Sequence, residues 1–499
     1  MQLQFEKTAL RCLGTALQEV QRSEVTQELR LPEGMPDIGR VLTTWGQVVI
    51  RSKQWQGNTI ELEGGVKLWM LYAPEDGTEP RCMDSWLPVQ IRWDVRQVDR
   101  EGPMRMVPLL SFADSRCLSA RKVMLRAGVS ALVQALYPME VETCTGGELP
   151  EDIQVLRRSY PVRLMKESGE KTFLMDEELT VPGGNVPVEK VFCVTANPEV
   201  TEKKVLSDKV VFKGNLNLHI VYRDQEGNVK SWDQAVPFSQ LSELDQAYGT
   251  EAQADILMAL TSLETDMAQP GQLRIKCGLV AQYLIDDRQV LEIVQDAYSV
   301  IRQVEPEIAA LEIPVILDER TENLTLEQSL QGRSGRTAEG VLCLDFPRKR
   351  EQGDSTELEV PGMFQTLVYD EHDSLQGMTC RCEGKIDIRS AENCRLMTLA
   401  RPAGSVQAVQ GMDAMELTSQ IQLWIRSGAM ERIPMVAALE LGPVRDEDAE
   451  RPSVILRDCR GDRLWDLAKS SSSTVEAICK ANGIEENDTV SGMLLIPVL

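Results

Sequence analysis

The fold class of this chain is decided by the stretch Ile60-Glu61-Leu62-Glu63-Gly64-Gly65-Val66-Lys67-Leu68-Trp69-Met70-Leu71-Tyr72. Most of its apolar side chains fall on even positions with charged side chains between them, a period of two that is typical of a half-buried β-strand. The same alternation returns 150 residues later, from Val210 to Tyr222. Gly64 and Gly214 stand at the same place in the two stretches and predict a bulge or a bend, because glycine weakens a regular strand.

An internal repeat extends outward from these two stretches. A shift of 150 residues places Leu29–Gly34 over Leu179–Gly184, and the register holds without a gap across about 100 positions. Acidic residues and a glycine follow both tyrosines, at Pro74–Gly77 and Asp224–Gly227, and predict hairpin turns. Because self-similarity at a fixed period marks repeated structural units, the sequence predicts tandem repeats of antiparallel β-structure.

A third, fainter repeat follows the first two. Phe364–Asp373 resembles the strand-to-turn segment at Tyr222 after a shift of 147 residues. We therefore predict a mainly β chain of tandem β-sandwich-like repeats, the first at 1–150, the second at 151–304 and a divergent third at 305–443. Helices are expected to be few here, with Ser130–Leu136 and Glu305–Leu311 as the segments that have a helical alternative.

The last part of the chain has a different composition. Residues 444–452 are dominated by charged side chains and are expected to form a solvated acidic linker. In residues 453–499, Asp462 and Ser473 are expected to cap two short helices, and Glu476 to complete a capping box after Ser473. Apolar segments before and after these helices predict strands, so the chain is expected to end in a small α+β domain of βααβ order.

Composition argues against two classes of protein. The 499 residues hold 53 Lys and Arg against 77 Asp and Glu, which gives a formal charge of −24 and a pI near 4.7. Nucleic acids and anionic lipids attract basic surfaces, so nucleic-acid binding is not expected. No apolar run approaches the roughly 20 residues needed to span a bilayer, so membrane insertion is not expected either.

The cysteines and the amino terminus indicate a compartment. The first residues show no basic region followed by an apolar stretch, so a secretion signal is not expected. The 12 cysteines have no repeated pair spacing, and we expect reduced thiols in a cytoplasmic protein. The close pair Cys380 and Cys382 lacks the two-residue spacing and the fourth ligand of a zinc site, so no metal is expected.

Side chains suited to catalysis are scarce. Only two histidines exist, His219 on the outer face of a predicted strand and His372 in a predicted acidic turn, and both are expected at the surface. Two histidines are too few for a histidine-based triad or zinc site to be expected. We predict no catalytic residue, no cofactor and no enzymatic activity.

Tryptophans crowd the first repeat, and most of them are expected in its core. Trp69 is the exception, since it occupies the strand face otherwise filled by Glu61, Glu63 and Lys67. Together with Trp55 it is predicted to form an exposed contact patch of the scaffold, because exposed aromatic side chains are enriched at interfaces.

The carboxy-terminal segment, residues 453–499, resembles a LysM module. The resemblance rests on Gly461-Asp462, Leu464-Trp465, Leu467-Ala468, Thr474-Val475, Ile478, Asn482 and Leu495-Ile496-Pro497. It implies a groove for an N-acetyl glycan or a peptide segment, between two loops that contain Gly461, Asp462, Arg463, Leu464, Asn482, Gly483 and Ile484.

Two departures from the LysM pattern affect the expected ligand. Arg463 replaces the usual hydroxyl residue after Gly-Asp, and Asp458 replaces an expected apolar residue. A guanidinium pairs with carboxylates and a neutral glycan offers none, so Arg463 favours a protein partner. The alternative interpretation gives Asp462 and Asn482-Gly483 ordinary capping roles at the ends of the two helices.

The repeats resemble a β-rich domain family of endospore-forming bacteria, whose signature here is Leu31-Pro32-Glu33-Gly34-Met35-Pro36-Asp37-Ile38-Gly39. Tandem copies followed by one LysM module are similar to SipL-type spore-coat morphogenetic proteins over nearly the whole chain. The resemblance implies a non-enzymatic scaffold in the mother-cell cytoplasm, at the forespore surface or spore coat. It also implies that the LysM-like module grips the coat-basement ATPase and that other coat proteins are partners.

Two other functions stay open at this point. One is a peptidoglycan-binding protein of the cell envelope, which the missing export signal opposes. The other is a hydrolase with a LysM anchor, which the lack of a His, Cys or metal constellation opposes.

Overall fold

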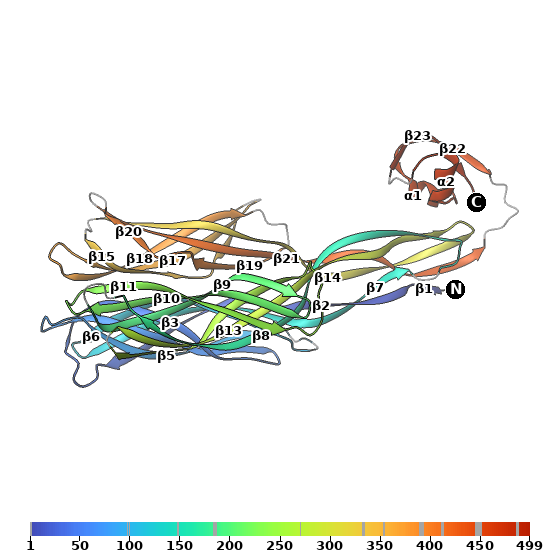
Figure 1. Ribbon diagram of the computed structural model, residues 1–499. Coiled ribbons are helices and arrows are strands. Elements are labelled where there is room, and N and C mark those ends of the chain that lie inside the picture. Colours follow the sequence, from blue (N-terminus) through green and yellow to red (C-terminus); the bar gives the residue numbers. More distant parts are fainter. Residues whose placement is uncertain are drawn as a thin grey trace.

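The computed structural model describes all residues except 1, 97, 99, 147–148, 183–186, 270, 332–334, 353–354, 389–393, 411–413, 445–451 and 486–488. The described residues form 23 strands and two short helices, so the expected mainly β class is confirmed. Most strands fall into three successive units, and a small module follows them at the carboxy terminus (Figure 1).

The first unit consists of two three-stranded antiparallel sheets. One has the order β2 (Glu6–Arg30), β7 (Lys122–Gly146), β6 (Met104–Ser119), and the other has the order β3 (Ile38–Gln56), β4 (Thr59–Pro74), β5 (Arg81–Asp94). Apolar side chains from both sheets form one core, in which Ile60, Leu62 and Leu68 of β4 are buried. The alternation that the sequence shows in this strand therefore places one of its faces in the core.

The second unit has the same strand order. One sheet contains β8 (Ile153–Thr180), β13 (Gln272–Ser299) and β12 (Gln253–Gln269), and the other contains β9 (Val188–Leu206), β10 (Lys209–Asp224) and β11 (Val229–Glu243). The bounds of β9 and β10 differ from those of β3 and β4 by 150 residues at both ends.

The third unit also consists of two sheets, but several of its outer strands are shorter than those of the first two units. One sheet contains β14 (Arg302–Gln331), β21 (Ala414–Val444), β19 (Arg395–Pro402) and β20 (Gln407–Gln410), and β1 (Gln2–Gln4) also pairs with β21. The other sheet contains β15 (Arg336–Leu344), β17 (Ser355–Tyr369), β18 (Leu375–Ile388) and β16 (Arg348–Gln352). β14 begins at Arg302, slightly before the start expected for this repeat.

The helical alternatives at Ser130–Leu136 and Glu305–Leu311 are wrong. Both segments lie inside long strands, β7 and β14. All of Ser130–Leu136 is buried, because neighbouring structure covers both faces of β7 here. A strand buried on both faces reads as a continuous apolar run, which periodicity cannot distinguish from a buried helix.

The two repeat glycines lie at the predicted bulges, and neighbouring strands approach them closely. The β3–β4 register shifts between Ile50 and Ser52, opposite Gly64, and the β9–β10 register shifts at Gly214. A Cβ atom on Gly64 would lie 2.2 Å from the Val49 carbonyl oxygen, and one on Gly214 would lie 2.0 Å from the Glu199 carbonyl oxygen. Any side chain at either place would therefore force the backbone apart.

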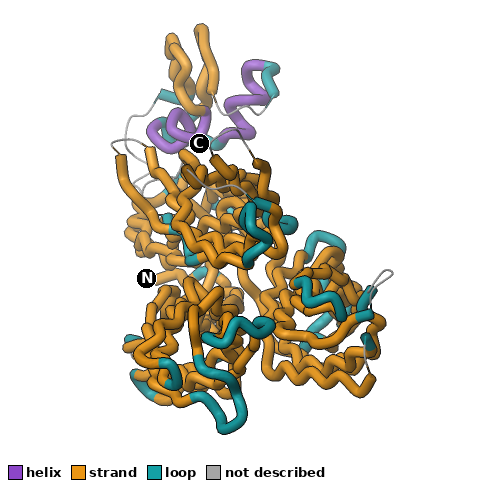
Figure 2. The backbone as a smooth tube through the Cα atoms, turned by 90° about the vertical axis from the view of Figure 1, so that its left-hand side faces the viewer, coloured by secondary structure: helices purple, strands orange, loops and turns teal. Residues whose placement is uncertain are grey.

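The three units lie around a common long axis and appear as three lobes in Figure 2. Three antiparallel ribbons, β2–β7, β8–β13 and β14–β21, run on beyond the shorter strands (Figure 1). Their ends pack around a separate apolar core that includes Leu10, Leu164, Ile293, Ile313 and Leu439. We call this part the stalk (residues 3–12, 139–146, 149–164, 291–315 and 433–441) and the rest of the three units the head.

The carboxy-terminal module has the expected strand-helix-helix-strand order. Its elements are β22 (Val454–Arg463), α1 (Leu464–Ser470), α2 (Val475–Asn482) and β23 (Thr489–Pro497). The cap of α2 is Thr474, whose side chain accepts a hydrogen bond from the Ala477 amide, so the expected cap at Ser473 is one residue too early. Most of the expected acidic linker lies outside the described residues.

Candidate functional site

The carboxy-terminal module contains the residues of the predicted groove. Gly461 and Arg463 are exposed at the end of β22, and Leu464 is buried at the start of α1. Asn482 and Ile484 are partly buried, and Gly483 is exposed. The two loops are tied to the same strand, because the Gly461 amide donates to Ser491 and the Asn482 side chain pairs with Leu495. Four residues of strand separate these attachments, which corresponds to about 13 Å.

Asp462 does not cap α1. Its carboxylate accepts a hydrogen bond from the Arg460 amide at 3.0 Å, and the N-cap residue of α1 is Arg463, which makes no capping hydrogen bond. The alternative interpretation of Asp462 as a helix cap is therefore wrong. Gly461 adopts φ +80°, so this turn at the end of β22 depends on a residue that tolerates the left-handed region.

Asn482 and Gly483 hold α2 against β23. The Asn482 amide group donates to the carbonyls of Ile478 and Leu495, and its oxygen accepts from the Leu495 amide at 2.8 Å. Gly483 ends α2 in the left-handed conformation, with φ +61°. Because all these polar groups are already engaged within the module, the capping interpretation describes Asn482 and Gly483 well.

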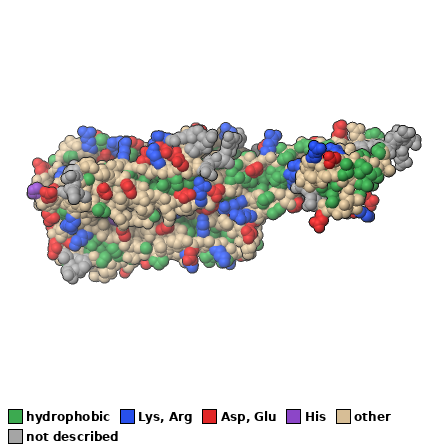
Figure 3. Space-filling model, turned by 90° about the horizontal axis from the view of Figure 1, so that it is seen from above, with side chains coloured by type: hydrophobic (Ala, Val, Ile, Leu, Met, Phe, Trp, Pro, Cys, Tyr) green, Lys and Arg blue, Asp and Glu red, His purple; other side chains and the backbone are tan. Residues whose placement is uncertain are grey.

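The outer face of the β22–β23 sheet carries a group of exposed apolar side chains, with Asp458 opposite Met493 at one end of it. Leu456 lies opposite Leu495 across the two strands, and Val454 and Met493 lie on the same face. Their exposed fractions are 70% for Leu456 and 67% for Met493. Figure 3, which views the molecule from the side that carries the module, shows hydrophobic side chains gathered over it. Sequence reasoning missed this surface, although alternation with buried Cys459 and Ile496 marks it.

The module contacts the carboxy-terminal end of β13 in the second unit. The Trp465 indole nitrogen donates to the Asp296 carboxylate at 2.8 Å, and the Lys469 ammonium lies 2.7 Å from the same carboxylate. The Tyr298 hydroxyl donates to the Ser473 carbonyl at 2.9 Å, and the Tyr298 and Trp465 rings meet edge to face with centroids 4.8 Å apart. Trp465 is partly buried against the core of the module and also makes this contact.

The expected exposure of Trp55 and Trp69 is wrong. Their exposed fractions are 8% and 5%. The Trp55 indole donates to the Gly57 carbonyl, and Trp69 packs into a core that the first unit shares with the second and third. Alternation assigns Trp69 correctly to the face of β4 that points away from its own sandwich. That face is covered by the neighbouring units, which a single strand does not reveal.

His219 also lies between units rather than at the surface. Its Nδ1 atom lies 2.6 Å from Asp233 in the second unit, and its Nε2 atom lies 3.2 Å from Glu339 in the third. Burial alone would lower the pKa of the imidazole, but the hydrogen bonds to the two carboxylates outweigh it and raise the pKa to about 9. The protonated ring therefore bridges two lobes of the head at neutral pH.

A buried ion network joins all three units near the axis of the head. The Arg105 guanidinium of the first unit lies 2.8 Å from Asp255 of the second, and Arg426 of the third lies 2.8 Å from Glu319 and 3.6 Å from Asp255. The buried members of the network are Arg105, Arg163, Asp255, Asp286, Glu319 and Arg426, and the exposed Lys203 lies at its edge. Charges so deeply buried are stable only when they are paired, so the network fixes how the lobes meet.

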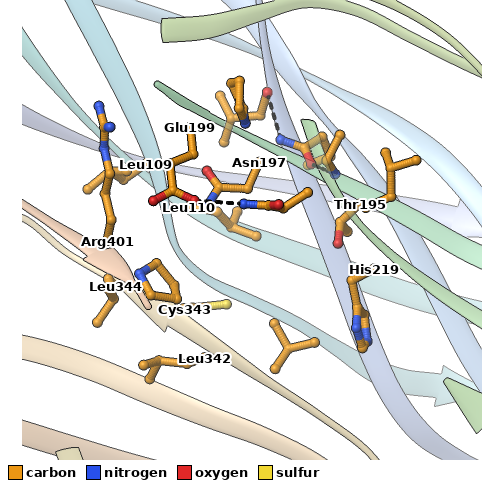
Figure 4. Close-up of a pocket in the computed structure, with 18 of the residues that line it drawn as sticks. Leu109, Leu110, Thr195, Asn197, Glu199, His219, Leu342, Cys343, Leu344 and Arg401 are labelled. Carbon is orange, nitrogen blue, oxygen red and sulfur yellow. Dashed lines mark hydrogen bonds between the residues drawn. The ribbon is translucent and has the colours of Figure 1, made fainter. Parts of the chain in front are cut away.

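A cavity of about 670 Å³ lies beside this network, where the three units meet (Figure 4). Its lining includes Leu110 of the first unit, Thr195 and His219 of the second, and Leu342 and Arg401 of the third. A cavity between units is invisible to strand periodicity, because its residues come together only through the packing of separate domains.

Three further observations bear on chemistry. Within the described residues, no group of three or more His, Cys, Asp or Glu side chains is arranged to hold a metal ion. None of the 12 cysteines forms a disulfide in the described structure. No helix in the described part of the chain has the length and apolar character required to cross a membrane.

Comparison with known proteins gives one match. Residues 187–267, which contain β9 to β11 and most of β12, match the family described as SipL, SPOCS domain. No curated protein and no solved structure matches the chain significantly. This segment of the second unit is therefore similar to a SipL SPOCS domain, which suggests a sporulation-associated protein.

Proposed function

We propose that this chain is a non-enzymatic assembly scaffold of the spore coat. In this proposal the three β units form the body of the scaffold, and the carboxy-terminal module, which resembles LysM, tethers it to a partner protein. The partner is the ATPase of the coat basement layer, other coat proteins bind the body, and the site of action is the forespore surface in the mother-cell cytoplasm. The SPOCS match supports the sporulation context.

The observation that carries the proposal is the uncovered apolar face of the module. Four large apolar side chains, Val454, Leu456, Met493 and Leu495, share one face of a two-stranded sheet. Contiguous apolar surface on a folded protein marks an interaction site. The face of such a short sheet offers about 300 Å², less than half of what one partner buries in a standard interface, so it suits a tether that works with further contacts.

A protein ligand fits the module better than a glycan. The Asn482 amide is engaged within the module, and Arg463 presents an exposed guanidinium that pairs with carboxylates. The peptidoglycan alternative requires neutral hydrogen-bonding groups in the predicted groove, and the polar groups of Asn482 are already satisfied there.

The test is capture by the full-length chain of two immobilised targets, the purified basement-layer ATPase and purified peptidoglycan. Leu456→Asp is expected to reduce capture of the ATPase about tenfold or more, because it places a charge in a desolvated contact. Arg463→Ala is expected to reduce capture of the ATPase less, because a charge at the exposed rim of an interface contributes little to affinity. The matched control is Leu174→Asp, because Leu174 is 64% exposed on β8, remote from the module.

Retention on peptidoglycan alone would contradict the proposal. Equal loss with Leu456→Asp and Leu174→Asp would also contradict it, since the effect would then not belong to the module.

A further inference from the structure

The cavity of the head lies where strand edges from all three units converge. Its lining comes from β3 and β6 of the first unit, from β9 to β12 of the second, and from β15, β19 and β21 of the third. All of these except β10 and β21 are edge strands of their sheets. The neighbouring units cover these edges, as when the Gln47 side chain accepts from the Ala196 amide at 2.8 Å. The cavity is thus the space that three imperfectly matched lobes enclose.

Most of the cavity wall is apolar. Side chains of Val107, Leu110, Leu260, Leu342 and Leu344 line it, and they come from all three units. A volume of about 670 Å³ falls within the range of small-molecule sites, which combine an apolar wall with a few placed polar groups. The wall is therefore suited to contact the aliphatic chain of a ligand.

Arg401 supplies an unpaired cation at one end. It lies on β19 and is partly buried, and within the described residues its guanidinium has no hydrogen-bond or ion-pair partner. The nearest lining carboxylate, Glu199, accepts a hydrogen bond from the Asn217 side chain at 3.0 Å instead (Figure 4). Burial lowers the pKa of Arg401, and attraction by Asp255 and Glu199 offsets this only in part.

The surrounding charges leave Arg401 without compensation. The buried part of the network beside it is balanced, with Arg105, Arg163 and Arg426 against Asp255, Asp286 and Glu319, so these carboxylates are already engaged. Because a guanidinium stays protonated, a partly buried one without a partner favours an external anion.

The opposite end of the cavity carries a net negative charge. There His219 lies between Asp233 and Glu339, two carboxylates around one imidazolium. An anion is repelled from that end and attracted to Arg401, so a ligand with one anionic group would bind in a single orientation.

We propose that the head cavity binds an amphipathic monocarboxylate, with its aliphatic chain against the leucine wall and its carboxylate on the Arg401 guanidinium. The ligand contacts all three units at once, so its binding also ties the lobes of the head together. This site is separate from the carboxy-terminal module and does not depend on the tethering function.

The probe is decanoate, titrated into the full-length protein by isothermal calorimetry. Two comparison probes separate the contribution of the aliphatic chain from that of the carboxylate. Acetate lacks the long aliphatic chain, and decanol lacks the charge. Decanoate is expected to bind at least about tenfold more tightly than either, because a charge-assisted pair and the apolar wall act together.

Arg401→Gln is expected to weaken decanoate binding about tenfold or more and to leave decanol binding unchanged. The matched control is Arg395→Gln, an exposed arginine on the same strand, which should bind decanoate as the wild type does. A second variant, Asn197→Trp, places an indole in the cavity from an exposed position and should block decanoate without removing any charge.

Thermal unfolding of each variant confirms that it is folded before titration. The proposal is overturned if decanoate does not bind the wild type, if decanol binds as tightly as decanoate, or if Arg401→Gln leaves the decanoate affinity unchanged. Decanoate binding that survives Asn197→Trp would place the ligand elsewhere and would overturn it as well.

Discussion

At the scale of single residues, local backbone constraints were predictable and burial by distant segments was not. Gly64 was recognised because a glycine inside an alternating strand has few explanations other than close approach. Trp69 and His219 were assigned to the correct strand face, but the structure covers that face with other units. A strand's own pattern reports which side chains point away from its sandwich, and it contains no information about what lies beyond.

His219 gives a prediction for pH dependence. Its folded-state pKa of about 9 lies above the unfolded value of about 6.5, so protonation stabilises the folded state. This contribution is fully present below about pH 6.5 and is lost as the pH rises through 9. His219→Gln is therefore expected to be less stable than the wild type by roughly 2–3 kcal/mol at pH 6, with the difference shrinking toward pH 9.5.

The measurement is urea denaturation of both proteins at a series of pH values. His372→Gln is the control, because that histidine lies in an exposed turn. A difference in the free energy of unfolding between wild type and His219→Gln that grows with pH would have the wrong sign. It would contradict a stabilising role of the protonated His219 ring between its two carboxylates.

At the scale of elements, strands were predictable where apolar and polar side chains alternate along the sequence. β4 and β10 have this alternation, and both were placed correctly although neighbouring units cover part of their second face. The segment Ser130–Leu136 was given a helical alternative because β7 is covered on both faces, which removes the alternation. In the module, the order of elements followed from caps and apolar spacing, whereas the uncovered outer sheet face depends on which side the helices pack.

The contact between the module and β13 gives the second prediction. Asp296 holds both the Trp465 indole and the Lys469 ammonium, so Asp296→Ala removes two charge-assisted contacts at once. We expect amide hydrogen exchange in α1 to become faster by about tenfold or more, since local opening exposes the helix.

Hydrogen exchange followed by mass spectrometry measures this effect, with peptides of the head as an internal reference. Asp287→Ala, on the same strand but outside the contact, should leave α1 unchanged. If α1 exchanges equally in both variants, the module is held by its apolar contacts and not by Asp296.

At the scale of the whole molecule, three similar units assemble around one axis with polar groups at their junction. The sequence predicted the repeats, because a shift of 150 residues aligns the first two without a gap and a shift of 147 residues matches a short segment of the third. It did not predict the junction, because Arg105, Asp255 and Arg426 belong to different repeats and meet only through domain packing. The cavity beside them was hidden for the same reason.

Asp255 gives the third prediction. Burial alone would raise its pKa, but Arg426 and Arg105 hold the pKa well below its usual value. Asp255→Asn leaves two buried guanidinium groups without their shared carboxylate and is expected to lower the free energy of unfolding by about 3–5 kcal/mol. The pKa is depressed, so this stability is present at neutral pH and is lost only as the pH falls below about 4.

Differential scanning calorimetry of the two proteins at pH 7 and at lower pH tests the prediction. Asp266→Asn, an exposed carboxylate on the same strand, should be close to neutral. Separate melting of the lobes in Asp255→Asn would show that the network couples them. A change no larger than that of Asp266→Asn would show that apolar packing alone holds the lobes together.

The continuity of the three ribbons from head to stalk has a mechanical consequence. β14 and β21 pair along nearly their whole length, and 30 residues of strand reach about 100 Å. A pull between the two ends of such a ribbon loads its hydrogen bonds in shear, so many must break together, whereas peeling from one end would break them in sequence. The molecule is thus built as a stiff strut that resists extension along its long axis.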